Sequence, residues 1–219
     1  MSKIKVFFSL NIFQFISYNF FRKNITRDKN CYIVPYRGTI IEFDKTAKID
    51  LHDNLFLNVA KLPHSRAECY LRLKKGAEMV VTGKVRIRYG TTIDIRTNGS
   101  FVIGKCNIAS GAVITCSKKI SIGNNCNIGR NCMIYDSDLH KVVDDSGNVL
   151  NYPREVIIGN NVWIGVKSTV LRGAKLKDGS VVGANSLVVG RVKEKILVMN
   201  EPAREISKIN WIREGFEND

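Results

Sequence analysis

One six-residue pattern runs through the second half of the chain. Between residues 158 and 188 an aliphatic residue returns at every sixth position, and small or polar residues fill the intervals. The aliphatic positions are Ile158, Ile164, Val170, Leu176, Val182 and Val188. A period of six matches neither the 3.6-residue period of a helix nor the two-residue alternation of a strand. It indicates a solenoid of stacked structural repeats.

The fold with this period is a parallel β-helix, which makes the chain an all-β protein. Each six-residue unit forms one short strand and one tight corner, three units close a triangular coil, and successive coils pair in parallel. The aliphatic residues then stack into an inner column. Gly and Asn supply the left-handed backbone that the corners require.

The pattern extends toward the N-terminus and is interrupted once. From residue 101 an aliphatic residue keeps the six-residue step as far as Ile120, where the phase slips by two residues to Ile122. The pattern stops at Tyr135 and returns at Val156. The sequence therefore predicts an inserted loop over 135–155, and a loop of about 20 residues between regular coils is typical of a functional segment.

The flanking segments extend the solenoid. Residues 32–100 contain short strand-like pieces separated by glycines, as expected of irregular early coils, so the β-helix domain is predicted over 32–200. Residues 1–31 then form an N-terminal extension. Residues 201–219 form a C-terminal segment, in which the isoleucine spacing predicts a short amphipathic helix near Ala203–Ile212 that caps the last coil.

Residues 1–25 are rich in aromatic side chains and basic at both ends. Polar residues at positions 9, 11, 14, 17 and 19 interrupt the apolar run, which makes it too polar for a membrane span. A small-residue cleavage site is missing, which argues against a secretory signal. Two interpretations remain: a cap on the open end of the β-helix or on a neighbouring subunit, which we favour, and a segment lying on an anionic membrane surface.

Composition narrows the class of protein. The 219 residues include 44% hydrophobic and 25% charged residues, as in soluble globular proteins. The net charge of +14 fits nucleic acid, an anionic lipid surface or phosphorylated small molecules. Because the basic residues form no long run and no aromatic stacking motif interleaves with them, we exclude nucleic acid as a partner. Six cysteines without a CxxC pair indicate buried thiols in the cytoplasm, and three scattered histidines indicate no metal site.

The repeats also carry a family resemblance. The stretches V-W-I-G-V-K-S-T-V-L-R-G (162–173), V-V-G-A-N-S-L-V-V (181–189) and P-A-R (202–204) resemble the hexapeptide-repeat acyltransferases, above all those that O-acetylate sugars and surface polysaccharides. The resemblance spans residues 78–206. It implies a left-handed β-helix, an exception to the usual right-handed crossover. It also implies acetyl-CoA as the acyl donor and a homotrimer with sites at the subunit clefts.

The candidate chemistry lies in Asp136-Ser-Asp138-Leu-His140, where the repeat opens into the loop. Acyl transfer from a thioester to a hydroxyl needs a base of near-neutral pKa, and a carboxylate on the other ring nitrogen would fix the tautomer. The motif alone is weak, but the resembled family has its catalytic histidine in a similar stretch, which implies His140 as the base. We favour Asp138 as the orienting carboxylate. Asp136 either shares that role or contacts the acceptor.

No competing nucleophile is apparent, since a G-x-S-x-G elbow is missing, so direct transfer is favoured over an acyl-enzyme.

Trp163 either shields an outer face or, as the resemblance implies, forms a stacking wall against the acceptor or the pantetheine arm. Asn151 matches a residue that closes the family's loop and faces the acceptor.

The resemblance also implies a coenzyme site along the coil edge. The backbone at Val166 and Ala184 would pair with the pantetheine amides, and Arg204, helped by Lys208, would bind the phosphates. The region before Pro202 lacks the proline turn and glycine usual in the family, which indicates a remodelled last coil.

The sequence thus predicts a cytoplasmic acetyl-CoA-dependent O-acetyltransferase that modifies a sugar hydroxyl for surface polysaccharide. The alternative interpretation of residues 1–25 would add the inner face of the membrane as a partner. Two alternatives stay open. One is another acyltransferase, acting on an amino sugar or on serine. The other is a β-helix that serves only as a scaffold, which would need the repeats but not the break at Asp136–His140.

Overall fold

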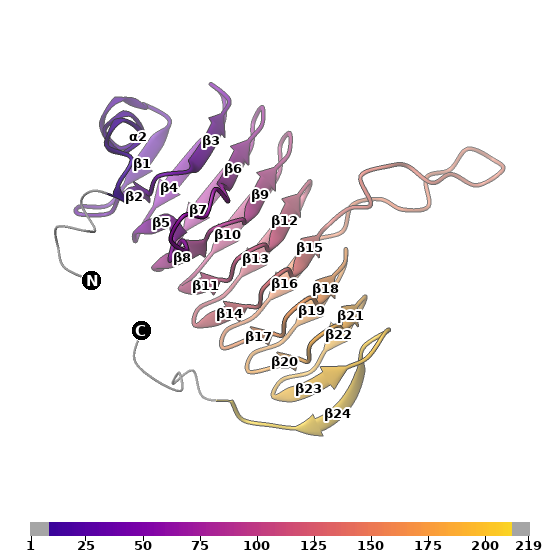
Figure 1. Cartoon of the computed structure of the whole chain (residues 1–219). Coiled ribbons are helices and arrows are strands. Elements are labelled where there is room, and N and C mark those ends of the chain that lie inside the picture. The colour runs from indigo at the N-terminus through magenta and orange to yellow at the C-terminus, as the bar shows by residue number, and fades with distance from the viewer. Residues whose placement is uncertain (1–8, 212–219) are drawn as a thin grey trace.

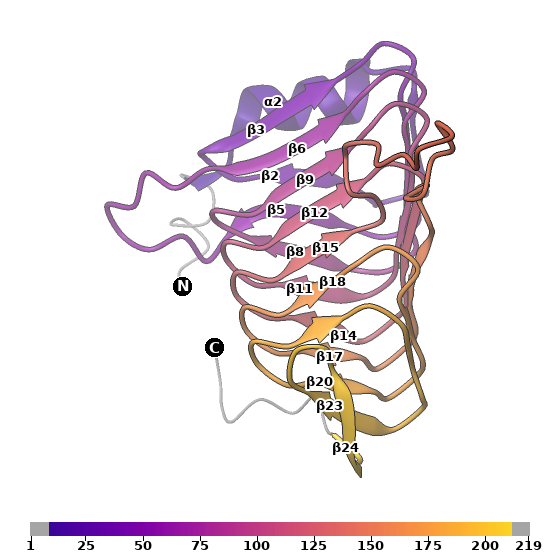
Figure 2. The same ribbon diagram turned by 90° about the vertical axis from the view of Figure 1, so that its right-hand side faces the viewer.

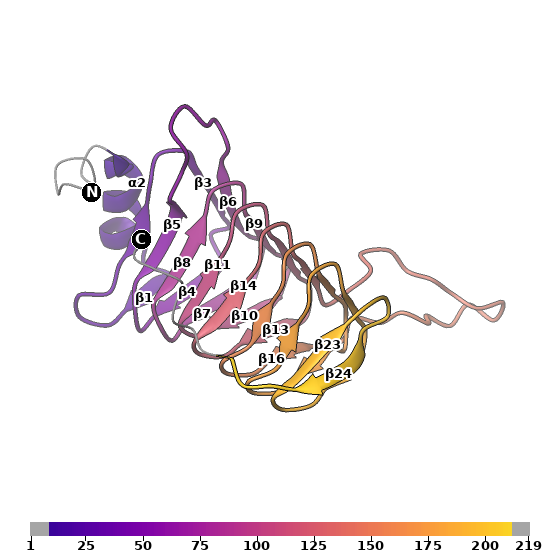
Figure 3. The ribbon, with the colours of Figure 1, turned by 60° about the horizontal axis from the view of Figure 1, so that its bottom comes forward.

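Short strands stack into three parallel sheets that form the sides of a triangular prism (Figures 1 and 3). The computed structural model describes residues 9–211. The chain winds as a left-handed β-helix, visiting the first, second and third sheet in turn. We call the bends corner 1 (first to second sheet), corner 2 (second to third) and corner 3 (third to first).

The strands are distributed as follows. The first sheet contains β1 (Ile25–Arg27), β4 (Lys48–Leu51), β7 (Glu78–Val81), β10 (Ser100–Ile103), β13 (Lys119–Ile122), β16 (Val156–Ile158), β19 (Lys175–Leu176) and β22 (Arg191–Val192). The second contains β2 (Ile33–Pro35), β5 (Leu55–Val59), β8 (Val85–Arg88), β11 (Cys106–Ile108), β14 (Cys126–Ile128), β17 (Trp163–Ile164), β20 (Val181–Val182), β23 (Ile196–Met199) and β24 (Arg204–Lys208). The third contains β3 (Thr39–Phe43), β6 (Cys69–Leu73), β9 (Thr92–Ile95), β12 (Val113–Cys116), β15 (Met133–Tyr135), β18 (Thr169–Val170) and β21 (Leu187–Val188).

The predicted inner column is confirmed. All six aliphatic residues between 158 and 188 are at most 2% exposed. Trp163 pairs with Val181 and Thr169 with Leu187, so one coil in this region takes 18 residues. Each buried aliphatic side chain contributes about 1.5–3 kcal/mol through the hydrophobic effect. The regular coil length is why the six-residue period is clearest here.

The phase slip at Ile120 has a simple structural cause. In β13 both Ile120 and Ile122 are buried, while Ser121 between them is half-buried. A four-residue strand can point two alternate side chains inward. The apparent slip is therefore a change from one inward residue to the next on the same strand. The earlier coils are longer, as the pairing of Cys106 with Cys126 shows.

The N-terminal segment covers the open end of the solenoid (Figures 1 and 2). Helix α2 (Ile12–Ile16) continues into a π-helical turn, η1 (Ser17–Phe21). The buried amide of Asn19 donates to the Ile33 carbonyl at 2.7 Å and accepts from the Ile33 N–H at 2.9 Å. This is the cap that we favoured, although the β-helix already begins at β1, inside the predicted extension 1–31. No helix within residues 9–211 is long and apolar enough to cross a membrane.

The helix predicted near Ala203–Ile212 is wrong, because residues 204–208 form strand β24. This strand pairs antiparallel with β23, with a shift in register between Leu197 and Val198. The outer edge of β23 carries backbone N–H and C=O groups that need partners, and β24 supplies them. That requirement outweighs the helix-like isoleucine spacing. Ile212 and the tail after it lie outside the described residues.

Candidate active site

The inserted loop leaves the solenoid after β15 and returns at β16, at corner 3. Its two arms meet where the Arg154 N–H donates to the Asp136 carbonyl at 2.9 Å. Farther out, Val143 and Val149 form an antiparallel bridge. Figure 1 shows the loop projecting well away from the prism.

Asp136 anchors the base of this loop. The residue is fully buried, and its carboxylate accepts the backbone N–H groups of Ser117, Lys118 and Lys119, each at 2.7 Å. Successive N–H groups that converge on one anion form a backbone nest. The structure therefore ties Asp136 to the preceding coil and brings it neither to the His140 ring nor to an open surface.

Asp138 is held by one side chain of the inserted loop and one of the following coil. Its Oδ2 accepts from Arg172 Nε at 2.8 Å and from Asn151 Nδ2 at 3.0 Å. Burial acts to raise the pKa of Asp138, but the hydrogen bonds from Asn151 and Arg172 and the charge of Arg172 outweigh it, so this pKa lies below its usual value. Asp138 is consequently an anion at neutral pH.

Asn151 fixes the backbone around His140. Its Nδ2 donates to the His140 carbonyl at 2.7 Å, and its Oδ1 accepts from the Val142 N–H at 2.7 Å. The His140 N–H donates to the Asp138 carbonyl at 2.8 Å across Leu139, which has a φ of 63°. This is the hydrogen-bond pattern of a γ-turn. A branched residue is strained in this left-handed conformation, so the hydrogen bonds around Leu139 are needed to hold it.

The His140 side chain is exposed, and within residues 9–211 its ring makes no hydrogen bond to a carboxylate. Asp138 therefore contacts His140 through the backbone and through Asn151, and the predicted carboxylate–imidazole pair is not formed in the single chain. Arg172 escaped the sequence analysis. The repeat could have indicated this residue. Val170 pairs with Ile134 in the neighbouring coil, which places Arg172 one coil below the base of the loop.

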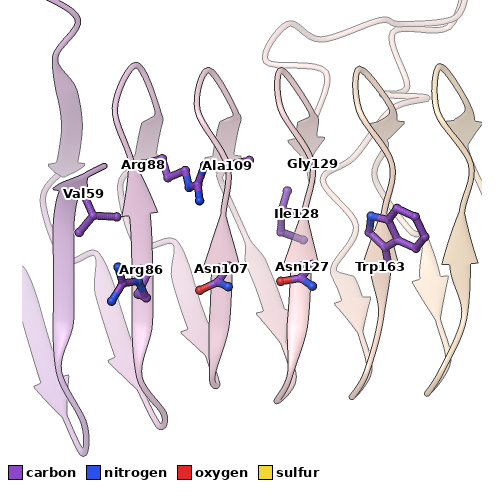
Figure 4. Close-up of a pocket in the computed structure, with 9 residues that line it drawn as sticks. All are labelled: Val59, Arg86, Arg88, Asn107, Ala109, Asn127, Ile128, Gly129 and Trp163. Carbon is purple, nitrogen blue, oxygen red and sulfur yellow. The ribbon is translucent and has the colours of Figure 1, made fainter. Parts of the chain in front are cut away.

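Trp163 lies on the outer face of the second sheet and is 46% exposed. It ends a groove of about 360 Å³, which Figure 4 shows in close-up. The groove is lined by Val59, Arg86, Arg88, Asn107, Ala109, Asn127, Ile128, Gly129 and Trp163. The strand register pairs Arg86 with Asn107, Asn107 with Asn127 and Asn127 with Trp163. These four side chains thus form a straight row, at about 4.8 Å per strand.

Two features of this groove were not predicted. The Trp211 ring lies 6.1 Å from that of Trp163, and its indole N–H donates to the Asn161 carbonyl. Trp211 follows the last repeat, so the periodicity gave no signal for it. At the other end, the Arg86 guanidinium lies 5.9 Å from the Phe56 ring centre. Within residues 9–211 neither arginine of the groove forms an ion pair.

The predicted coenzyme residues lie on corner 2, with one exception. Val166 and Ala184 are exposed and occupy this corner in successive coils, where the Asn185 N–H donates to the Val166 carbonyl at 2.9 Å. Strand β24 places Arg204 opposite Met199, at the same corner. Lys208 lies at the other end of β24, about 13 Å away for a four-residue step, at corner 1.

The site residues form two groups in one chain. His140, Asp138, Asn151 and Arg172 lie at corner 3, whereas Val166, Ala184 and Arg204 lie at corner 2, and Trp163 lies on the second sheet. The third sheet separates these groups. The first group offers an exposed imidazole beside an anion, and the second offers an open corner of small residues and a cation. Within residues 9–211 no group of three or more His, Cys, Asp or Glu residues could hold a metal ion.

Two family models match the coils on either side of the loop. One is described as "Bacterial transferase hexapeptide (six repeats)" and matches residues 155–190. The other, "Hexapeptide repeat of succinyl-transferase", matches residues 119–134. Both lie in the part of the solenoid where the inner column is most regular.

Curated proteins and solved structures point the same way. The putative lipopolysaccharide biosynthesis O-acetyl transferase WbbJ of Escherichia coli (strain K12) is 46% identical over 55 residues, 25% of this chain and 28% of that protein. The galactoside O-acetyltransferase of Escherichia coli (strain K12) is 27% identical over 135 residues, 62% of this chain and 63% of that protein. The chain thus spans less than two thirds of each relative's length. The crystal structure of the polySia specific acetyltransferase NeuO has the same fold, with a TM-score of 0.55 and 21% identity over 89% of this chain and 91% of that one.

Repeat pattern, coil geometry and matches together define the class as left-handed β-helix proteins built from hexapeptide repeats. The coils on either side of the inserted loop carry the hexapeptide repeats that the two family models describe.

Proposed function

We propose that the chain is an acetyl-CoA-dependent O-acetyltransferase that modifies a sugar hydroxyl, in the biosynthesis of a surface polysaccharide. One observation carries this proposal: an exposed His140 whose backbone is fixed by the buried Asn151, next to the anionic Asp138. A histidine of near-neutral pKa is the usual general base for removing a hydroxyl proton. The names of the acetyltransferase relatives support the reaction class.

The chemistry that we assign to the site is direct transfer. The acceptor hydroxyl attacks the thioester carbonyl while His140 takes the hydroxyl proton, which forms a tetrahedral oxyanion. The intermediate collapses as the carbon–sulfur bond breaks. The imidazolium then returns its proton to the departing thiolate, so products are the acetyl ester and the free thiol of coenzyme A. Asp138 acts in this scheme as a positioning residue, through Asn151.

We assign the donor to corner 2 and the acceptor to the groove on the second sheet. The exposed backbone at Val166 and Ala184 suits the amides of the pantetheine arm, and Arg204 supplies a cation for a phosphate. Lys208 is too far along β24 to share that role at the same corner. The groove offers amides in line with Trp163, the kind of polar and aromatic surface that sugar rings contact.

The two groups of residues lie at different corners of one chain, so we propose a homotrimer in which they come together at the subunit clefts. Corner 3 of one copy would meet corner 2 of its neighbour. The loop supports this, because several of its apolar side chains are more than a third exposed: Leu139, Val142, Val143, Leu150 and Tyr152. Exposed apolar clusters of this kind are typical of interfaces. The six buried thiols support a reducing compartment, the cytoplasm.

The test is thiol release from acetyl-CoA with neutral sugars, acidic sugars, amino sugars and serine as acceptors. His140→Asn should lower acceptor-dependent turnover by at least about a hundredfold, the usual contribution of a general base, while coenzyme A binding by calorimetry is retained. His64→Asn, at an exposed histidine outside the site, is the matched control and should behave as wild type. Full turnover by His140→Asn would remove His140 from this role. Preference for amine acceptors would establish the N-acyltransferase alternative. If the wild type fails to bind coenzyme A, only the hypothesis of a non-catalytic scaffold remains.

A further inference from the structure

The helical cap at the N-terminal end has its apolar face turned outward. Ile12, Phe13, Ile16, Phe20 and Phe21 are all exposed, with Phe13 at 89% and Phe21 at 77%. At about 100° per residue Ile12, Phe13 and Ile16 lie on one side of α2, and Phe20 and Phe21 follow in the π-helical turn η1. A helix that packs on a protein surface normally shows the reverse arrangement, with its apolar stripe buried.

The opposite face of the cap explains this orientation. Gln14 Nε2 donates to the Thr39 carbonyl at 3.1 Å, and the Tyr18 hydroxyl donates to the Ile41 carbonyl at 3.0 Å. Together with Asn19, these side chains satisfy backbone groups at the end of the first coil. The polar residues of the segment are thus needed on the inner face, and their hydrogen bonds fix the outward direction of the apolar stripe.

From this arrangement we infer that the cap binds the surface of an anionic membrane. An exposed aromatic and aliphatic stripe on a short helix suits the boundary between lipid headgroups and acyl chains. The chain adds positive charge at the same end: residues 1–35 contain six basic residues and one acidic residue. Lys23, which follows the stripe, is exposed. Lys and Arg near such a stripe attract anionic lipid.

Two acidic side chains near this end contact a histidine. Asp28 and Asp50 lie 3.0 and 3.2 Å from the two ring nitrogens of His52, and these contacts, with the hydrogen bond to Asp28 first, raise the pKa of His52. The Arg22 guanidinium lies 5.4 Å from the ring centre of the buried Tyr18.

Charge also decides between a membrane and a second copy of the chain as the occupant. Two copies that met cap to cap would bring two basic ends together, each with six basic residues and one acidic residue in positions 1–35, and these ends would repel each other. An anionic bilayer satisfies the apolar stripe and the positive charge together. Membrane contact at this end would leave the loop 136–155 and the groove on the second sheet free, because the cap covers only the N-terminal end of the prism (Figure 2).

Flotation of the full chain with lipid vesicles tests the inference. Wild type should float with phosphatidylcholine vesicles that contain phosphatidylglycerol at low salt, and much less with phosphatidylcholine alone or at high salt. Phe13→Ser combined with Phe21→Ser should weaken this binding at least tenfold, since both side chains lie in the stripe. Val189→Ser removes an apolar residue of the last coils that is 53% exposed, and this variant should bind as wild type.

Three results would overturn the inference. The first is that the wild type does not bind the anionic vesicles, and the second is that the double variant binds them as well as the wild type. The third is that the double substitution changes only the oligomeric mass, which would make the stripe an interface between copies. Acetyl transfer to a soluble acceptor provides the independent readout. The double variant should retain it, because neither phenylalanine belongs to the proposed active site, so failure here leaves the proposed function untouched.

Discussion

Asn151 joins the two residues that the D-x-D-x-H motif singles out. The sequence identifies His140 and Asp138 as candidates, but their spacing implies a direct contact that the chain does not make. Instead the buried amide of Asn151 contacts the Asp138 carboxylate, the His140 carbonyl and the Val142 N–H at once. The position of the imidazole therefore depends on a residue that lies at the far arm of the loop.

Replacing this amide should impair turnover more than folding. Asn151→Ala removes three hydrogen bonds within the loop, so we expect kcat to fall about 10- to 100-fold, as when a positioned group moves by about 1 Å, with little change in Tm. Asn148→Ala, at an exposed loop residue that contacts Asp144, is the control. Steady-state kinetics and thermal unfolding measure both. An unchanged kcat in Asn151→Ala would show that the clamp does not position His140.

The lowered pKa of Asp138 predicts how one part of the stability varies with pH. A carboxyl group whose pKa is lower in the folded chain stabilises the fold above its unfolded pKa, about 3.9 for Asp. That contribution disappears as pH falls through the folded-state pKa. The difference in unfolding free energy between wild type and Asp138→Asn should thus be constant from pH 7 to about pH 5 and shrink below about pH 4. Urea unfolding from pH 3 to 7 measures it, and a difference that grows in acid would contradict the assignment.

At the scale of elements, the loop 136–155 depends on its anchor at corner 3. Asp136 satisfies three backbone N–H groups of the coil above, and no other described side chain accepts from them. Asp136→Ala would leave these part-buried donors without their acceptor, which costs about 3 kcal/mol. Urea unfolding should show this loss, whereas Asp144→Ala, at the outer turn of the same loop, should change stability by less than about 1 kcal/mol. Equal effects would mean that Asp136 is not the anchor.

The comparison of sequence and structure separates elements with a repeat from those without one. The inner column after Val156 and the ends of the loop could be predicted from the six-residue period. That period arises because every coil has the same length and buries its aliphatic residues at the same places. The strand at residues 204–208 could not be predicted in this way. These residues form a strand because the edge of β23 needs a hydrogen-bonding partner, and that is a tertiary interaction. Arg172 and Trp211 were not predicted as site residues for the same reason, because the residues that they contact lie in other parts of the chain. The row from Arg86 to Trp163 depends on register, which single-sequence patterns leave open.

At the scale of the whole molecule, the separation of corner 3 from corner 2 predicts that assembly and activity go together. Val142→Asp combined with Leu150→Asp places two charges on the exposed apolar part of the loop. Light scattering should give wild type the mass of three 24.7-kDa chains and the variant a smaller mass, with turnover reduced in proportion. Tyr135 and the inner column are untouched, so the circular dichroism spectrum should remain that of wild type. A monomeric variant with full turnover would place the complete site within one chain.

The elements that cover the two ends of the prism stop further coils from being added. Each end of a parallel coil is a row of backbone donors and acceptors onto which a further coil, or the end of another molecule, can add. Here α2 and η1 occupy one end, and on the second sheet β24 finishes the other with an antiparallel pairing that the winding cannot continue. A chain cut after Asn200 would present β23 as a bare template. Because α2 and η1 cover the other end of every chain, the bare β23 edges of two shortened chains can pair only with each other, so we expect dimers joined tail to tail. Strand β24 is therefore the element that prevents this association of the whole chain.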